Sequence, residues 1–535
     1  MERITLGELV RQKAKKNSRK IFLSFQDRQF SYEEMDRQSR RFAQAFRSLG
    51  IGRGDHVALI LPNEPEYLFC WFGLAMLGAV TITVNHQLRG ESLQYVLREA
   101  DSQMVILAPE FLPSYEAMGA GLSGIPSFAL QPLDKPPETP VGIDSLNRFI
   151  PEEASDFRPD GSLKDIDPLI ITFTSGTTGL PKLVENGHRA YIASARDLAE
   201  YAEMKPQDRI YSHLPLYHAN PQVYCVLAAL LADACVILAP RFSASRFWED
   251  IRRYRATAFS YVGAVLPILL AQPERPDEKE HPAKKCFGGG APKDVYDEFT
   301  RRFGVEVLEL YGMSESGVWN TINRPGKGRS GTVGTIRRGF SIQIVDEEDN
   351  PLPPGTIGEI VIRPEVPFLM FHGYYKNPEE TLRCSRNWWF HTGDLGKVDA
   401  EGYYTFCGRK KETIRRAGEN IPPGEIERVI ARHPAIRECA AVGIPDPIME
   451  EEIKVVAVLK AGQEISPQAL FEFAREKLPR FMMPRYIEFV EALPKSASEK
   501  IQRTVLKKQG LTDRTWDAKG QKGQDGTPQP REGGT

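Results

Sequence analysis

The stretch LIITFTSGTTGLPK, Leu169–Lys182, joins an apolar run to a loop that is dense in hydroxyl groups. The run LIITFT predicts a buried strand, because apolar and β-branched residues follow one another without a break. The glycines of the loop let backbone N–H groups approach an anion closely, the hydroxyls add donors, and the final lysine adds a compact positive charge. The loop therefore predicts a phosphate site, with candidate ligands Thr174, Ser175, Gly176, Thr177, Thr178, Gly179 and Lys182.

This loop is not a Walker A loop. No Gly-Lys-Ser or Gly-Lys-Thr run follows its second glycine, and Pro181 opposes an immediate helix interior. The alternative interpretation is a mobile surface turn that binds nothing. The concentration of hydroxyl residues between Thr174 and Thr178 argues against that alternative.

The alternation of short apolar runs with helical stretches extends from Asp55 to about Gly312. In the segment SRFWEDIRRY, Phe247, Ile251 and Tyr254 share one helical face. This rhythm predicts an α/β fold with largely parallel sheets. The predicted buried strands are 56–61, 81–85, 103–108, 169–174, 235–240, 257–263 and 305–312.

The residue composition and pattern change twice along the chain. Turn residues become frequent at 331–408, which predicts a β-rich subdomain that completes a large N-terminal domain, 1–408. Residues 409–510 alternate helical and strand patterns and predict a small α+β C-terminal domain. The polar, Gly- and Pro-rich segment 511–535 predicts a disordered tail.

Composition excludes several classes of protein. The formal net charge is −2, so no strong basic field recruits nucleic acid. The uncharged run Tyr67–His86 approaches the length of a membrane span, but Gly78 and the β-branched residues after it favour a buried helix followed by a strand. The 7 cysteines are scattered without CxxC spacing, which indicates neither a zinc site nor a disulfide framework. With no secretory signal at the N-terminus, we expect a cytoplasmic protein.

Eight further segments follow the phosphate loop in a fixed order, and together they resemble the adenylate-forming enzymes. This family includes acyl-CoA synthetases, firefly luciferases and the adenylation domains of peptide synthetases. One such segment could arise by chance, but the whole series in register is specific. The segments are LPLYH (214–218), GGAP (289–292), YGMSES (311–316), GEI (358–360), GYY (373–375), WFHTGDLG (389–396), GRKKETIRRAGENIPPGEIE (408–427) and LPKSASEKIQR (493–503).

The resemblance implies an ATP site in the N-terminal domain. Tyr311 would stack on adenine, and the carboxylate of Asp394, at a turn after an aromatic strand, would accept both ribose hydroxyls. Glu315 would be the Mg²⁺ ligand, since a hard cation on phosphate oxygens needs few protein ligands. Taken singly, each has an ordinary alternative, a core tyrosine or a capping carboxylate. The remaining implied residues are Gly290, Ala291 and Pro292 opposite Tyr311, Gly312 and Ser314 beside Glu315, Arg409 on the ribose and His218 beside the acid.

The resemblance also implies a mobile C-terminal domain. Lys500 would enter the active site and neutralise charge on the α-phosphate during adenylation. The domain would then turn about Lys411 and bring the segment around Gly418 to the CoA channel. From the residues alone, Lys500 is one solvated lysine among many, and GRKKET is a surface loop.

The function implied is ATP-dependent ligation of a carboxylic acid to CoA through an acyl-adenylate. The rivals are an enzyme that loads a carrier-protein thiol, a luciferase-like oxygenase and an inactive binding protein. The stretches FCWFGLAMLGA, SASRFWEDIRRYRAT and NPLPPGTIGEI look most like bacterial crotonobetaine/carnitine-CoA ligases. Aromatic faces would suit a quaternary ammonium, with Tyr217, Tyr261 and Trp319 as candidates, or they would wall an apolar acyl pocket. The oligomeric state stays open, with a homodimer as one alternative.

Three positions depart from the family pattern. Leu183 stands where glycine usually follows the loop lysine, and Gly187 stands where serine or threonine is common. Glu499 replaces the glycine before Lys500 and places a negative charge next to it. We expect slower adenylation or an altered loop conformation from that change.

Overall fold

The computed structural model describes most of the 535-residue chain. The described residues are 3–88, 90–116, 124–135, 143–154, 157, 159, 161–174, 181–416, 419–421, 423–446, 449–478, 480–495 and 501–520. Mixed α/β sheets form a large N-terminal domain, and a smaller C-terminal domain follows it. The predicted fold class is confirmed.

An eight-stranded sheet carries the strand that leads to the phosphate loop. Its central strands run parallel, and β8 (Pro168–Thr174) lies between parallel β4 and antiparallel β9. The parallel strands are almost continuously buried, as strands covered on both faces should be. The order is β19 (Gly373–Tyr374), β9 (Lys182–Gly187), β8, β4 (Val80–Thr83), β3 (His56–Ile60), β5 (Met104–Leu107), β6 (Ser127–Ala129), β7 (Asp144–Ser145).

A nine-stranded sheet carries the other predicted buried strands. Strands β10 to β14 pair in parallel, so their carboxyl ends share one edge. That edge holds the segments that the sequence assigned to adenine. The order is β16 (Thr335–Ile336), β15 (Thr321–Ile322), β14 (Glu306–Tyr311), β13 (Lys285–Gly289), β12 (Ala258–Val262), β10 (Arg209–Ser212), β11 (Cys235–Leu238), β1 (Ile21–Phe25), β2 (Arg28–Ser31).

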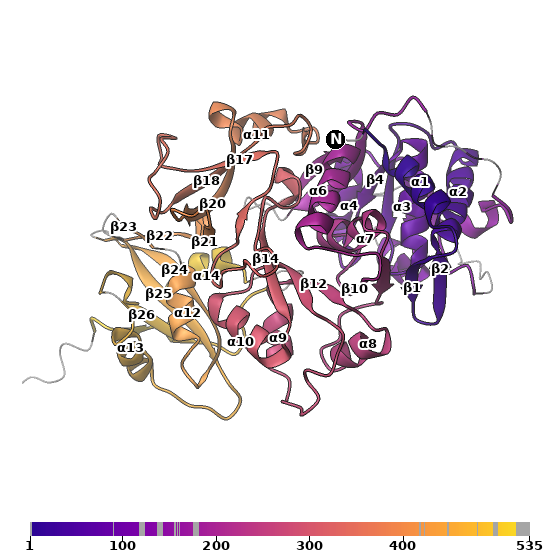
Figure 1. Ribbon diagram of the computed structural model, residues 1–535. Helices are drawn as coiled ribbons and strands as arrows, with labels where there is room; N and C mark the ends of the chain where they lie inside the picture. Colours follow the sequence, from indigo (N-terminus) through magenta and orange to yellow (C-terminus); the bar gives the residue numbers. More distant parts are fainter. Residues whose placement is uncertain are drawn as a thin grey trace, which may run out of the picture.

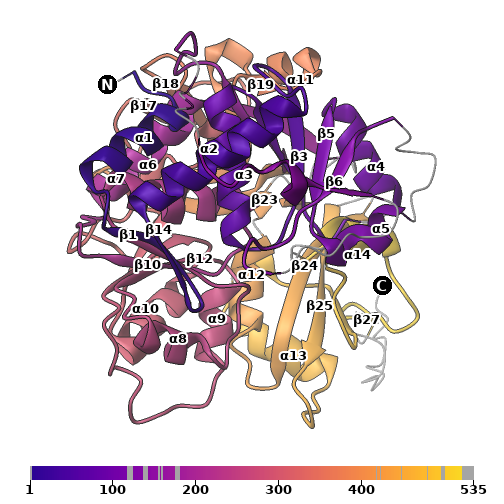
Figure 2. The same cartoon turned by 90° about the vertical axis from the view of Figure 1, so that its right-hand side faces the viewer.

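The helix α3 (Pro65–Leu77) is buried along its whole length. It contacts two amphipathic helices and β4, so its apolar character on every side reflects a central position rather than a membrane span. Figure 2 shows α1, α2 and α3 side by side. No described helix is long and apolar enough to cross a bilayer. The other helices of this domain are α1 (Leu6–Lys16), α2 (Tyr32–Ser48), α4 (Gly90–Glu99), α5 (Leu112–Glu116), α6 (His188–Tyr201), α7 (Ala228–Leu231), α8 (Phe247–Arg253), α9 (Val265–Leu270) and α10 (Lys293–Phe303).

A four-stranded antiparallel sheet occupies the segment with frequent turn residues. Figure 1 shows it in orange, between the magenta part of the large domain and the yellow end of the chain. Its strands and the neighbouring helix are β17 (Phe340–Val345), β18 (Gly358–Pro364), β20 (Phe390–Val398), β21 (Tyr404–Arg409) and α11 (Pro378–Arg383).

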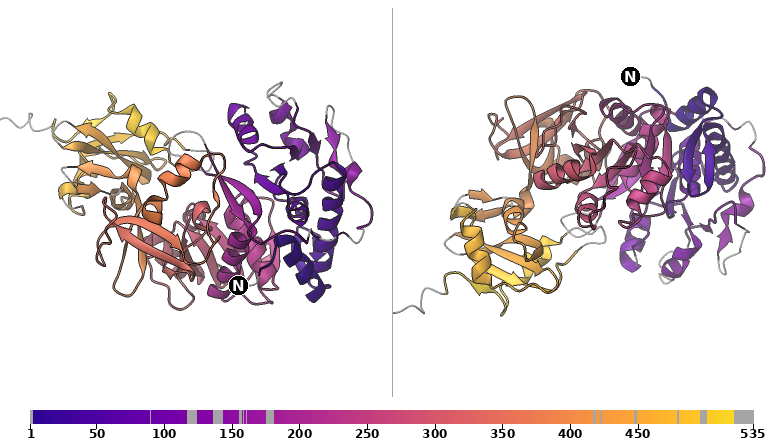
Figure 3. Two further views of the ribbon diagram at one scale, coloured as in Figure 1. Left: turned by 90° about the horizontal axis from the view of Figure 1, so that it is seen from above. Right: turned by 60° about the horizontal axis from the view of Figure 1, so that its bottom comes forward.

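The C-terminal domain is built on a six-stranded sheet. In the right-hand view of Figure 3 it lies beside the orange strands and away from the indigo start of the chain. Its elements are β22 (Ile414–Arg416), β23 (Glu419–Ile421), α12 (Pro423–Ile430), β24 (Ile436–Asp446), β25 (Glu450–Leu459), α13 (Pro467–Arg475), β26 (Tyr486–Phe489), α14 (Arg503–Gln509) and β27 (Trp516–Asp517).

The prediction of disorder from Leu511 is wrong for residues 511–520. Strand β27 pairs antiparallel with β26, and the Trp516 ring lies 5.6 Å from that of Phe471. The Asp517 carboxylate accepts two hydrogen bonds from Arg485, each 3.1 Å long. One large apolar ring and one ion pair attach a segment whose average composition is polar. Residues 521–535 lie outside the described structure.

Candidate active site

Two neighbouring parallel strands bring the predicted adenine residues together. Strand β13 ends at Gly289, where Gly290–Pro292 begins, and β14 ends at Tyr311. Residues Gly290–Pro292 form a wall that lies at the same edge of the sheet as Tyr311. Tyr311 is 8% exposed, and Phe406 stacks near its ring at 5.9 Å.

Glu309 fastens this wall, and sequence reasoning missed it. Its carboxylate accepts hydrogen bonds from the backbone N–H of Gly290 at 2.6 Å and of Ala291 at 3.1 Å, and another from the Tyr261 hydroxyl. Burial raises the pKa of Glu309 to about 7. The signal in the sequence was a carboxylate inside the otherwise apolar run VLELY.

Asp394 lies against Tyr311. The Tyr311 hydroxyl donates to its Oδ2 at 2.9 Å, and the Nε of Arg409 lies 3.7 Å from its Oδ1. Asp394 and Arg409 are directly opposed across β20 and β21. The expected turn position is wrong, since Asp394 belongs to β20. Strand pairing thus unites the two residues that the resemblance assigned to ribose.

Acidification is expected to weaken ATP binding through Asp394. Burial raises its pKa to about 6, with Arg409 acting in the opposite direction. Above that pH the carboxylate can accept two ribose hydroxyls; below it, the protonated group loses acceptor capacity. We therefore expect kcat/KM for ATP to fall as the pH drops through about 6, because this parameter reports the free enzyme. Asp394→Asn should lower kcat/KM above about pH 6 and remove this step, so that the two profiles converge at lower pH; a profile identical to that of the unaltered enzyme would contradict the assignment.

Glu315 occupies a short 3₁₀ turn, η5 (Ser314–Ser316), and its side chain is buried. The Tyr374 hydroxyl donates to its Oε1 at 3.0 Å, and the Phe371 N–H donates to its carbonyl oxygen at 3.0 Å. Asn186 donates to the Ser314 carbonyl at 3.1 Å. Strand β9, the segment before β19 and β19 itself therefore hold the turn in place.

A Mg²⁺ ion fits this donor set. The described residues contain no group of three or more His, Cys, Asp or Glu side chains able to hold a metal. Mg²⁺ on a nucleotide commonly uses one or two carboxylates plus phosphate oxygens and water, so Glu315 alone is compatible with it. Burial raises the pKa of Glu315, and a cation would favour its ionised form.

Lys182 begins β9 at the far side of the phosphate loop. Its ammonium lies 4.8 Å from the centre of the Tyr374 ring and pairs with Glu380 of α11. Because Tyr374 also binds Glu315, the predicted phosphate lysine and the predicted metal carboxylate belong to one connected group.

His218 is exposed, so it is not a core histidine. The loop Leu214–His218 is held by Asn63, whose Nδ2 donates to the Leu214 carbonyl at 2.9 Å and whose Oδ1 accepts from the Leu216 N–H at 2.8 Å. Gln222, in the π-helix η4 (Pro221–Leu227), donates to the Leu216 carbonyl at 2.7 Å. The sequence alone did not identify Asn63 or Gln222, because nothing in the chain around His218 indicates that these two side chains bond to the backbone of this loop.

Comparison with known proteins supports the family resemblance. A family model described as AMP-binding enzyme matches residues 10–375, and one described as AMP-binding enzyme C-terminal domain matches residues 425–500. The chain belongs to the AMP-binding enzyme family. The resemblance inferred from the motifs is confirmed.

Relatives of this AMP-binding enzyme are CoA ligases. A crotonobetaine/carnitine–CoA ligase of Salmonella agona is 33% identical over 483 residues, 90% of this chain and 93% of the relative. The anthranilate CoA ligase AuaEII in complex with anthranoyl-AMP superposes with a TM-score of 0.86 and 26% identity, covering 95% of this chain and 97% of the other. ATP-bound MatB from Rhodopseudomonas palustris gives a TM-score of 0.84 and 27% identity, covering 95% and 99%. This AMP-binding enzyme is an ATP-dependent, AMP-forming acid–thiol ligase that works through an acyl-adenylate, with CoA as its thiol substrate.

Several predicted residues of this AMP-binding enzyme lie outside the described structure. Lys411 belongs to η7 (Lys410–Glu412), directly after Arg409, but its side chain is not described. The others are Ser175, Gly176, Thr177, Thr178, Gly179, Gly418 and Lys500, together with Glu499.

Two departures from the family pattern have structural reasons. Leu183 is 5% exposed and packs in the apolar core beside β8. At Gly187, a Cβ would lie 2.8 Å from the His372 Nε2 and 3.0 Å from the Asp167 carbonyl oxygen. A serine or threonine there would collide with His372.

The aromatic residues considered for a quaternary ammonium each have partners of their own. The Arg337 guanidinium already lies 4.9 Å from the Trp319 ring centre, and Tyr261 is fully buried with its hydroxyl on Glu309. Tyr217 contacts His86 and His218 instead. None of the described ring contacts joins Tyr217, Tyr261 and Trp319 to one another.

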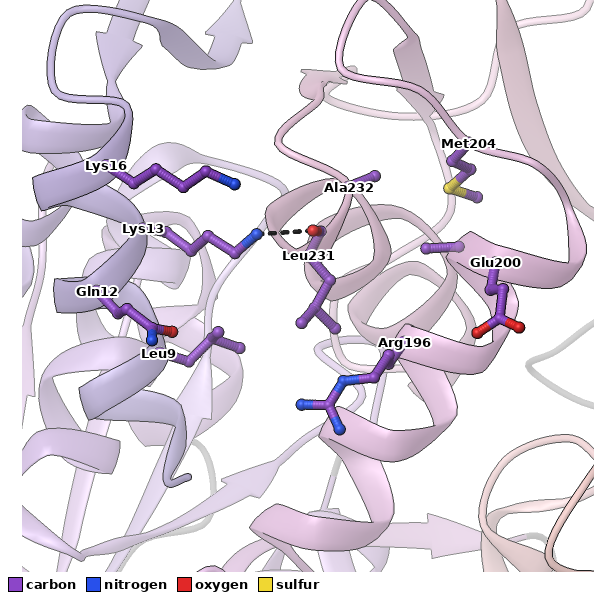
Figure 4. Close-up of a pocket in the computed structure, with 10 residues that line it drawn as sticks. Leu9, Gln12, Lys13, Lys16, Arg196, Glu200, Met204, Leu231 and Ala232 are labelled. Carbon is purple, nitrogen blue, oxygen red and sulfur yellow. Dashed lines mark hydrogen bonds between the residues drawn. The ribbon is translucent and has the colours of Figure 1, made fainter. Parts of the chain in front are cut away.

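A cavity of about 470 Å³ lies between α1, α6 and α7, and Figure 4 shows its side chains. Lys13 donates there to the Leu231 carbonyl and also pairs with Asp233. The residues that line it include none of the predicted site residues. This cavity is therefore separate from the active site.

Proposed function

We propose that both half-reactions of the ligase take place where Asp394, Tyr311, Glu315 and Lys182 converge. The observation that supports this is the pair of hydrogen bonds, Tyr311 to Asp394 and Tyr374 to Glu315, with Lys182 over the Tyr374 ring. They combine an aromatic face, a ribose acceptor, a metal carboxylate and a phosphate cation. ATP needs each of these groups.

In the first half-reaction, a carboxylate oxygen of the acid bonds to the α-phosphorus of ATP. The bond to the bridging oxygen breaks, and pyrophosphate leaves. Asp394 and Arg409 would orient the ribose, while Gly290–Pro292 and Tyr311 would enclose adenine. Mg²⁺ on Glu315 would neutralise phosphate charge, and Lys500 would stabilise the charge that develops on the α-phosphate.

In the second half-reaction, the CoA sulfur bonds to the acyl carbonyl, AMP leaves and the thiol proton is released. We propose that residues 409–520 form a mobile domain, which turns about Lys411 relative to residues 1–408 and replaces Lys500 with the segment around Gly418. Arg503, three residues after Lys500, donates to Glu412 of η7 at 2.9 Å and to Glu427 at 2.8 Å. These hydrogen bonds connect the end of the Lys500 segment to the hinge turn, which favours movement of the domain as one rigid body.

The acid is proposed to be an ordinary short- or medium-chain, alicyclic or aromatic carboxylic acid. The Salmonella relatives act on crotonobetaine and carnitine, but here Arg337 already occupies a face of Trp319. His218, exposed at the end of its loop, would stand beside the acid or its adenylate. We further propose a cytoplasmic homodimer; all 7 cysteines of the chain are free thiols, which suits a reducing compartment.

The test is a panel of acids, including crotonobetaine and carnitine, assayed for pyrophosphate and for thioester. We expect pyrophosphate release only with an acid present, and AMP and thioester release only when CoA is added. Thioester formation on a carrier protein but not on CoA would contradict the CoA ligase. Acid-independent ATP hydrolysis would contradict adenylation.

A further inference from the structure

An ion pair holds the predicted phosphate lysine before ATP arrives. The Lys182 ammonium donates to Oε1 of Glu380, whose side chain is 14% exposed, while that of Lys182 is 22% exposed. The two residues are far apart in the chain, on β9 and α11, so only the fold brings them together. A triphosphate reaching Lys182 has to compete with this carboxylate.

Glu380 has a second cation that allows it to release Lys182. The Arg383 Nε donates to its Oε2 at 2.6 Å, and Arg383 Nη2 reaches Oε1 at 2.5 Å. Hydrogen bonding from Arg383 is the largest of the effects that lower the pKa of Glu380 to about 2. If Lys182 moves to a phosphate, Glu380 keeps a bidentate partner and no carboxylate is left unpaired.

Lys182 is also connected to Glu315, the predicted metal ligand, through Tyr374. Its ammonium lies over the Tyr374 ring, whose hydroxyl binds Glu315. The positive charge of Lys182 is one of the influences that lower the pKa of Glu315 against the effect of burial. Lys182 thus stands between two carboxylates, one paired with Arg383 and one suited to Mg²⁺.

We propose that Glu380 is a positioning residue that exchanges Lys182 with the phosphates: it holds the ammonium beside Glu315 in the empty enzyme, yields it to ATP, and reclaims it to promote the release of pyrophosphate. This inference rests on the proposed function, because it takes Lys182 as the phosphate lysine. Arg383 sets the balance by competing with Lys182 for the same carboxylate.

Two charge-removing variants are expected to act in opposite directions. Glu380→Gln removes the competitor, so product inhibition by pyrophosphate should strengthen by about tenfold, as for loss of a partly buried ion-pair partner. The KM for ATP should fall in the same variant. Arg383→Gln leaves Glu380 more dependent on Lys182, so pyrophosphate inhibition should weaken and the KM for ATP should rise. A purely structural role for α11 would weaken binding in both variants.

Glu379→Gln is the matched control, since it removes the same charge from the exposed neighbouring position of α11. In a Lys182→Ala background, Glu380→Gln should have no further effect on pyrophosphate inhibition. An unchanged inhibition constant in Glu380→Gln, or shifts in the same direction in both variants, would overturn the proposal. Asp394→Asn distinguishes failure of the proposed function from failure of the exchange. If this variant leaves ATP binding intact, the proposed nucleotide site is wrong. If it weakens ATP binding while Glu380→Gln changes nothing, only the exchange fails.

Discussion

Lys500→Ala is expected to slow formation of the acyl-adenylate by about 10²–10³ and to leave conversion of a supplied adenylate to the thioester nearly unchanged. The reason is electrostatic: attack on the α-phosphorus accumulates negative charge, which a positioned ammonium stabilises, whereas the thiol step proceeds after pyrophosphate has left. Single-turnover assays of the two half-reactions measure these rates separately.

Lys508→Ala is the matched control for Lys500→Ala, because Lys508 is an exposed lysine on α14 of the same domain. It should leave both half-reactions unchanged. Equal loss of both half-reactions in Lys500→Ala would contradict a rotating domain and indicate a general structural role. Unchanged adenylation would remove Lys500 from the mechanism.

Arg337→Met is expected to destabilise the N-terminal domain by about 3–5 kcal/mol, the typical cost of breaking a buried ion pair. Arg337 is 0% exposed, and its Nε donates to the Asp197 carboxylate at 2.7 Å. Its Nη1 also donates to the carbonyls of Gly317 at 3.2 Å and Trp319 at 3.3 Å. Methionine fills much of the volume but leaves these acceptors without their shared donor.

The midpoint of urea unfolding, followed by tryptophan fluorescence, measures this effect. Arg338→Met provides the control, since Arg338 is 47% exposed and also pairs with Asp197. Its loss should cost about 0–1 kcal/mol, as for a surface pair. If both variants shift the midpoint equally, the buried ion pair contributes no more to stability than the exposed pair does. Because Gly317–Trp319 begins two residues after Glu315, Arg337→Met should also raise the KM for ATP.

The phosphate loop and the strand before it show which features can be predicted from neighbouring residues in the sequence. Strand β8 forms where the run of apolar and β-branched residues predicts it, because this signal depends on neighbouring residues alone. The resemblance likewise supplied Tyr311, Asp394 and Glu315 from short segments.

Partners that lie far apart in the chain required the structure. The carboxylate of Glu309 in VLELY does not reveal that it fastens Gly290 and Ala291, and nothing in KNPEET indicates that Glu380 meets Lys182. The docking of 511–520 on β26 likewise depends on one tryptophan, which average composition conceals.

The sequence by itself indicated the α/β fold class and the family, because apolar periodicity and contiguous motifs are local properties. Tertiary structure alone decided other neighbours of charged groups: Arg337 against Asp197, and Lys182 between Glu380 and Tyr374. The physical reason is that burial and Coulomb interactions depend on distance in space, which the pairing of strands and the packing of helices fix only in the folded chain.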